Sequence, residues 1–364
     1  MIVPETKRLL FRKFKVDDFS AVHSYASCEE NIVYMLFDRN TEKATQNFIN
    51  HAIQSFDANP ITDYHFAVIL KENNQLIGGC SIVIADNTLS DDNTEPMKDT
   101  FSSDSEAEIG WLVHRDYWKQ GYGVEMGREM LRFGFDDLNI HRIIAHCDAE
   151  NIGSYKIMEK IGMRREGLFW DARPPHKLSN KKYSDELSYA MLKDEWDVQK
   201  EIAYYKSLPI IFDDFIDVPI LDDGVIRLVC TEKKSAIPEK KWIPSYTFAI
   251  CSGSEKVGNL SLRIGYGGGD YDCNCYYGGQ IGYGIDEAHR GNGYAGRACK
   301  LVAPVAKAHN MTKLLITTKD SNKASMRVCE KLGARYVRLV RLPEWTDSYK
   351  LGNRYQNIYE YSLE

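Results

Sequence analysis

The segment Gln120-Gly-Tyr-Gly123, followed downstream by Asn151-Ile-Gly-Ser154, occurs in this chain a second time. The second copy reads Asn292-Gly-Tyr-Ala295 and then Asn322-Lys-Ala-Ser325. The copies are 172 residues apart at the glycine turn (121 to 293) and 171 apart at the asparagine (151 to 322). A period of this length is the size of a whole domain and far too long for a solenoid unit. The repeat therefore predicts two homologous globular domains in tandem.

Composition agrees with two ordinary globular domains. The chain has 364 residues, of which 43% are hydrophobic and 27% charged, with a net charge of -6. It has no basic run, which argues against nucleic acid as a partner. No apolar stretch approaches the ~18 residues that a membrane helix needs, so no membrane partner is expected.

The nine cysteines are an odd number without framework spacing, and no apolar signal segment follows Met1. This pattern favours a reducing cytoplasm over a secreted disulfide scaffold. The closest pair, Cys273 and Cys275, lacks the partner Cys or His pairs of a zinc site. The sequence therefore indicates a cytoplasmic protein without a metal.

Strands and helices alternate in the second half of each copy, which indicates a partly parallel sheet and an α/β fold with a mixed (α+β) sheet. We expect domains at residues 1–194 and 223–364, joined by a linker at 195–222. The first domain has about fifty residues between its first two strands, and these are expected to form helices. The second domain has only about fifteen residues at this place. A polar stretch at residues 86–105 is expected to be a long mobile loop.

In the first copy an apolar strand ending at Val113 leads through the glycine turn into an amphipathic helix at residues 122–138. Backbone N–H groups at such a turn, together with the positive end of the helix dipole, form a generic anion site. Glycine allows the backbone to approach phosphate oxygens closely. The turn by itself is also compatible with a simple tight turn.

Arg290-Gly-Asn-Gly-Tyr-Ala295 resembles the Q/R-x-x-G-x-G/A pyrophosphate motif of the GNAT acetyltransferase superfamily. The two Asn-x-x-Ser passages resemble that superfamily's next helix, whose asparagine contacts coenzyme A. From residues 8–12 to the Tyr183-Ser-Asp-Glu pattern, the first domain is similar to the ribosomal-protein N-terminal acetyltransferase (RimJ/RimL-like) branch. It departs from the motif at Trp118 and Lys119.

The resemblance implies acetyl-CoA as co-substrate and direct attack of an amine on its thioester. It assigns acetyl-CoA binding to Val113, Gln120, Gly121, Tyr122, Gly123, Val124, Asn151, Ser154, Ile285, Arg290, Gly291, Asn292, Gly293, Tyr294, Ala295, Asn322 and Ser325.

Catalysis requires a base for the amine and a donor for the developing oxyanion. The resemblance places the base at Glu108, which could equally be a solvated carboxylate at a strand end, and the donor at the N–H of Val113. Gln280 takes the place of Glu108 in the second domain and cannot serve as a base. Tyr183 is a candidate acid or a residue of the acceptor site.

These observations favour a tandem acetyl-CoA-dependent N-acetyltransferase whose first domain is the catalyst. The acceptor would be a protein N-terminus, a polyamine, an antibiotic or another amine. In one alternative the second domain catalyses and the first supports it. In another the chain is a non-catalytic acyl-CoA sensor. The sequence does not settle the oligomeric state.

Overall fold

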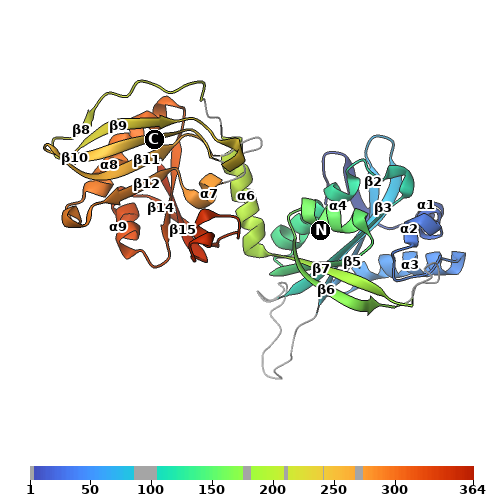
Figure 1. Ribbon diagram of the computed structural model, residues 1–364. Coiled ribbons are helices and arrows are strands. Elements are labelled where there is room, and N and C mark those ends of the chain that lie inside the picture. Colours follow the sequence, from blue (N-terminus) through green and yellow to red (C-terminus); the bar gives the residue numbers. More distant parts are fainter. Residues whose placement is uncertain (1–3, 86–104, 175–181, 209–211, 241, 267–273) are drawn as a thin grey trace. The chain divides into compact units, whose positions relative to one another are not determined.

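The computed structural model describes residues 4–85, 105–174, 182–208, 212–240, 242–266 and 274–364 (Figure 1). These residues form two compact units, Met1–Asp197 and Val198–Glu364. Each unit contains one mixed sheet, so the expected α/β class with two similar halves is confirmed.

The sheet of the first unit has seven strands in the order β1-β2-β3-β4-β5-β7-β6. The β4–β5 pair is parallel, and the other neighbouring pairs are antiparallel. The strands are β1 (Leu9–Lys13), β2 (Asp63–Leu70), β3 (Gln75–Ala85), β4 (Glu106–Val113), β5 (Arg142–Asp148), β6 (Arg164–Arg173) and β7 (Ser184–Leu192).

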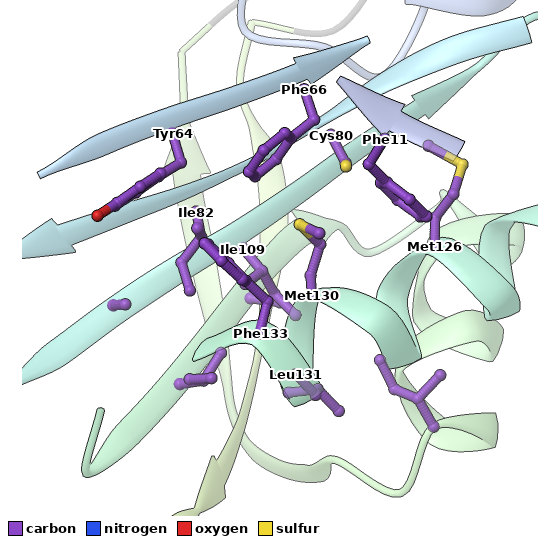
Figure 2. Packing of buried hydrophobic residues seen from close by; sticks show 14 of the residues in the cluster. Phe11, Tyr64, Phe66, Cys80, Ile82, Ile109, Met126, Met130, Leu131 and Phe133 are labelled. Atoms are coloured by element: carbon purple, nitrogen blue, oxygen red, sulfur yellow. The ribbon is translucent and has the colours of Figure 1, made fainter. Parts of the chain in front are cut away.

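Helices cover both faces of this sheet. The helices of the unit are α1 (Phe19–Ala26), α2 (Glu29–Ile32), α3 (Glu42–Gln54), α4 (Tyr122–Arg132) and α5 (Ile152–Lys160), and α6 (Lys193–Ser207) begins in this unit and continues into the second. Figure 2 shows Met126 and Met130 of α4 directed at the strands that carry Phe11, Ile82 and Ile109, all of them buried. The opposite face packs against α1 and α3 in a smaller core around Phe14, Val22 and Ile49. The alternation of side chains along each strand gives the sheet these two apolar faces.

The second unit repeats this plan in an eight-stranded sheet, in the order β14-β15-β13-β12-β11-β10-β9-β8. Its strands are β8 (Leu221–Asp222), β9 (Arg227–Lys234), β10 (Ser245–Ser252), β11 (Glu255–Arg263), β12 (Ile281–Ile285), β13 (Lys313–Lys319), β14 (Arg335–Arg341) and β15 (Tyr355–Ser362). Its helices are α7 (Asn274–Gly278), α8 (Tyr294–Ala308), α9 (Lys323–Leu332) and α10 (Asp347–Lys350).

The expected difference between the copies is present. Three helices separate β1 from β2, whereas the described residues between β9 and β10 contain a single 3₁₀ turn, Pro238–Lys240. The helix expected at 122–138 ends its α-helical part at Arg132 and continues as a π-helical turn to Asp137. The polar stretch at 86–104 lies outside the described residues. Within the described part of the chain, no helix has the length and apolarity that a membrane span requires.

Candidate functional site

The central strands of the first unit separate at the proposed reaction centre. β4 and β5 are paired only from Glu106 to Glu108, although β4 continues to Val113. The N–H of His114 donates to the carbonyl of Ile77, beside β3, at 2.8 Å. In an antiparallel pair, the N–H groups of successive residues point alternately towards and away from the partner strand, so the N–H of Val113 points away from β3. That N–H therefore faces the opening between β4 and β5.

Gly78 on β3 allows the backbone at the end of β4 to approach β3 unusually closely. A Cβ added to Gly78 would lie 2.2 Å from the carbonyl oxygen of Leu112, a separation that real side chains essentially never show. The second unit repeats the arrangement, with Gly258 on β11 and the carbonyl oxygen of Gly284 on β12 at 2.3 Å. In both units the close approach of the two strands therefore requires a glycine in the neighbouring strand.

The glycine turn of the first unit presents a row of free donors. Lys119 and Gly121 have left-handed backbone angles, φ 59° and 84°, and α4 begins at Tyr122. Among the described residues, no acceptor pairs with the backbone N–H groups of 119–124. The Arg8 guanidinium donates to the carbonyl of Gln120 at 3.0 Å and also forms an ion pair with Glu125 of α4 at 2.6 Å. The converging N–H groups suit an anionic phosphate.

The second unit builds the same turn with glycine at both left-handed positions. Gly291 has φ 88° and Gly293 has φ 75°, and the N–H groups of 291–296 likewise have no acceptor in the described part of the chain. A pocket of about 760 Å³ begins at this turn and runs over α8, lined in part by Arg297, Lys300 and Lys331. Asp222 and Asp223 line the same pocket, and Asp223 forms an ion pair with Arg297 at 2.9 Å. Lys300 and Lys331 suit a ligand that carries phosphates.

Trp118, which departs from the pyrophosphate motif, forms a hydrogen bond equivalent to that of its counterpart Arg290, to the carbonyl at the end of the preceding strand. The indole Nε1 of Trp118 donates to the carbonyl of Val113 at 2.7 Å. In the second unit Nε of Arg290 donates to the carbonyl of Ile285 at 3.2 Å. Either side chain fastens the turn to the end of its strand, so tryptophan keeps this structural role.

The repeated asparagines are helix N-caps. Oδ1 of Asn151 accepts from the N–H of Ser154 at 3.1 Å, and Oδ1 of Asn322 accepts from the N–H of Ser325 at the same distance. An N-cap oxygen satisfies one of the unpaired donors of the first helical turn. The cap uses the side-chain oxygen and leaves the amide NH₂ group for a ligand.

Glu108 projects from β4 on the face covered by α1 and α3, with 55% of its side chain exposed. Its Oε1 lies 3.3 Å from Nδ1 of His146 on β5. The hydrogen bond to Glu108 raises the pKa of His146 above its usual 6.5, against the opposing effect of burial, and Glu186 raises it further. His146 lies 38 positions from Glu108, and no motif or spacing in the sequence indicates this pair.

The second unit has no titratable group at the matching position. Gln280 is fully buried, and its Nε2 donates to the carbonyl of Gly265 at 3.0 Å. Its Oε1 accepts from the N–H of Leu315 at 2.5 Å. Thr317 occupies the position of His146. The amide therefore bridges two backbone segments, and an uncharged amide is not a base for proton transfer.

The Acetyltransferase (GNAT) domain family matches this sequence at residues 8–164 and again at 227–335. The chain belongs to the GNAT acetyltransferase family. It is an N-acetyltransferase, which confirms the class expected from the repeated turns.

Several members of this GNAT family resemble the chain over about half of its length. The uncharacterized N-acetyltransferase YnaD of Bacillus subtilis (strain 168) is 36% identical over 191 residues, 52% of this chain and 97% of that protein. The uncharacterized N-acetyltransferase p20 of Bacillus licheniformis is 26% identical, over 52% of this chain and 96% of its own. A crystal structure of a GNAT-family acetyltransferase from Bacillus anthracis is 36% identical and covers 53% of this chain and 100% of its own, with a TM-score of 0.42.

Tyr183, the remaining residue expected at this GNAT site, is exposed and directly precedes β7. The ammonium group of Lys182 lies 5.7 Å from the centre of its ring. Among the described residues, no hydrogen bond joins its hydroxyl to the Glu108–His146 pair, so its role stays a prediction.

Proposed function

We propose that this protein transfers an acetyl group from acetyl-CoA to a primary amine and that the first unit performs the transfer. The observation that carries the proposal is the pairing of Glu108 with His146 beside the opening between β4 and β5. The second unit has the same opening without a titratable pair.

Glu108 is the proposed base. An ammonium group must lose a proton before it can attack a thioester, and a carboxylate at this position accepts the proton directly or through one water. His146 is a positioning residue, because its hydrogen bond orients Oε1 and leaves Oε2 to the amine. The carboxylate of Glu108 on this face also favours a cationic acceptor.

The N–H of Val113 is the proposed donor to the thioester carbonyl. It points into the opening, and a donor fixed by a strand needs no reorganisation when charge develops on the oxygen. The free N–H groups of 119–124, with Arg8, are the proposed site for the pyrophosphate of acetyl-CoA.

For the second unit we propose acyl-CoA binding without turnover. Its turn has glycine at both left-handed positions, and Lys300 and Lys331 line the adjoining pocket, which supports binding. Gln280 is a buried, uncharged amide that is hydrogen-bonded to two backbone groups, which argues against proton transfer there.

The test of catalysis uses the full chain with Glu108→Gln and an amine panel containing a polyamine, an aminoglycoside and a short peptide with a free N-terminus. Loss of a positioned base should slow acetylation by about 100-fold or more, with acetyl-CoA affinity unchanged. The matched control is Glu255→Gln, which breaks a similar Glu–His pair in the second unit, Glu255 Oε1 to His289 Nε2 at 3.2 Å. Near-normal turnover in Glu108→Gln, or an equal loss in the control, would refute the assignment.

The test of the second unit is calorimetric titration of the full chain with acetyl-CoA. We expect two sites in the wild type and one in Gly293→Val, because a branched side chain is strained at φ 75° and occupies the space of the phosphate. Turnover should be retained. If the variant still binds two molecules, the second site lies elsewhere.

A further inference from the structure

Three potential metal ligands from two elements meet on the first unit's sheet, away from the cysteines that the sequence analysis weighed. Asp63 and His65 are two residues apart on β2 and so share a face. His51 lies in the last turn of α3, which packs on that face. The ligand atoms of the three residues all lie within 4.8 Å of one another.

The carboxylate of Asp63 stands between the two imidazoles. Its Oδ2 is 2.9 Å from Nε2 of His51, with hydrogen-bond geometry. Its Oδ1 is 2.8 Å from Nε2 of His65, yet this buried oxygen has no hydrogen-bond partner in the described residues. A buried carboxylate oxygen without a donor is costly. A cation shared by this oxygen and the His65 nitrogen would remove the cost.

We propose that His51, Asp63 and His65 bind a divalent transition-metal ion, with Zn²⁺ the best fit and water completing the coordination. Two imidazoles and one carboxylate are a common ligand set for Zn²⁺, whose bonds of about 2.0–2.2 Å place neighbouring ligand atoms about 3.3 Å apart in a tetrahedron. To admit the ion, the distances of 2.8 and 2.9 Å would open slightly, and the other ligand-atom separations, all within 4.8 Å, would adjust towards the tetrahedral value. The open fourth position suits a water, because His51 is 61% exposed.

The surroundings favour a cation at this place. His51 lies at the C-terminal end of a 13-residue helix, where the helix dipole is negative. The T-shaped contact between the His51 and His65 rings, 5.4 Å between centroids, keeps both nitrogens near the carboxylate. Phe48 packs against the other side of His65 at 5.7 Å and limits its rotation.

Bound Zn²⁺ would fasten α3 to β2 on the face that carries the proposed base. Asp63 is opposite Val83 on β3, and Val83 is opposite Glu108 on β4, so all three share one row of the sheet. The metal therefore has a structural role in the helical wall that the second unit lacks. The cysteine spacing predicted no metal, and the His51–Asp63–His65 cluster, which contains no cysteine, is the reason to test that prediction.

The experiment titrates the full chain, purified without a histidine tag, with Zn²⁺ by calorimetry and with Co²⁺ by absorption spectroscopy. We expect one tight site and the visible absorption of Co²⁺ bound by nitrogen and oxygen. Loss of a second-shell partner weakens metal binding about 10- to 100-fold, so loss of a direct ligand in His65→Ala or Asp63→Asn should weaken it at least about 100-fold. Thermal unfolding should shift upward with Zn²⁺ in the wild type and not in the two ligand variants.

His289→Ala is the matched control, because it removes a histidine that pairs with a single carboxylate, Glu255. It should bind Zn²⁺ like the wild type. Circular dichroism checks that each variant is folded, and Asp63→Asn changes no volume. The absence of a tight site in the wild type, unchanged affinity in both ligand variants, or a thiolate-to-cobalt charge-transfer band would each overturn the proposal.

Discussion

Replacing Gly78 with alanine tests which unit catalyses. The added Cβ would lie 2.2 Å from the Leu112 carbonyl oxygen, whereas real Cβ contacts stay above 3.0 Å. The strands must therefore move apart by at least about 0.8 Å, and such overpacking costs about 1–3 kcal/mol of stability. Because Leu112 precedes Val113, the same movement displaces the proposed oxyanion donor. A misplacement near 1 Å can lower turnover about 100-fold.

Gly258→Ala is the matched perturbation in the second unit, where the Cβ would lie 2.3 Å from the Gly284 carbonyl oxygen. Both variants should unfold at lower temperature by calorimetry. The rate of thiol release from acetyl-CoA with a saturating amine should fall in Gly78→Ala and stay near wild type in Gly258→Ala. The reverse pattern would show that the second unit is the catalyst, and a folded Gly78→Ala with full activity would refute the role given to the Val113 N–H.

Two further predictions concern local interactions. Asn151→Ala and Asn322→Ala each remove an N-cap and should each lower the free energy of unfolding by about 1 kcal/mol, measured by chemical denaturation; no loss in either would contradict the cap assignment. The pKa of His146 is raised by Glu108, so the stabilisation from this pair is present below pH 6.5 and is lost as the pH rises through the folded-state pKa. Nuclear magnetic resonance should show a lower His146 pKa in Glu108→Gln, and an unchanged value would mean that the two groups do not interact.

Local patterns made the repeated turns predictable. The left-handed backbone at Gly121 and Gly293 and the helix starts that follow are short-range features, encoded by glycine and by helical periodicity. The replacement of Glu108 by Gln280 followed from aligning the two copies.

Contacts across the sheet could not be predicted in this way. The Glu108–His146 pair joins residues 38 positions apart, and it exists because the parallel register sets β5 beside β4 at Glu108. The Arg8 contact with Gln120 spans 112 positions. Neither pair carries a spacing signal, since strand order and register follow from tertiary packing. The His51–Asp63–His65 cluster required the packing of α3 for the same reason.

The division between the two compact units falls inside α6, and this limits where the chain can be cleaved by a protease or truncated. Trp196 is buried in the core of the first unit, whereas Tyr205 is buried in that of the second. Glu201 accepts from Tyr276 at 2.6 Å and from Arg338 at 3.0 Å, all within the second unit. Proteases cleave unfolded segments, so they should find no preferred site at this helical boundary. A truncated gene for the second unit should begin no later than Val198, and one for the first unit should extend past Trp196.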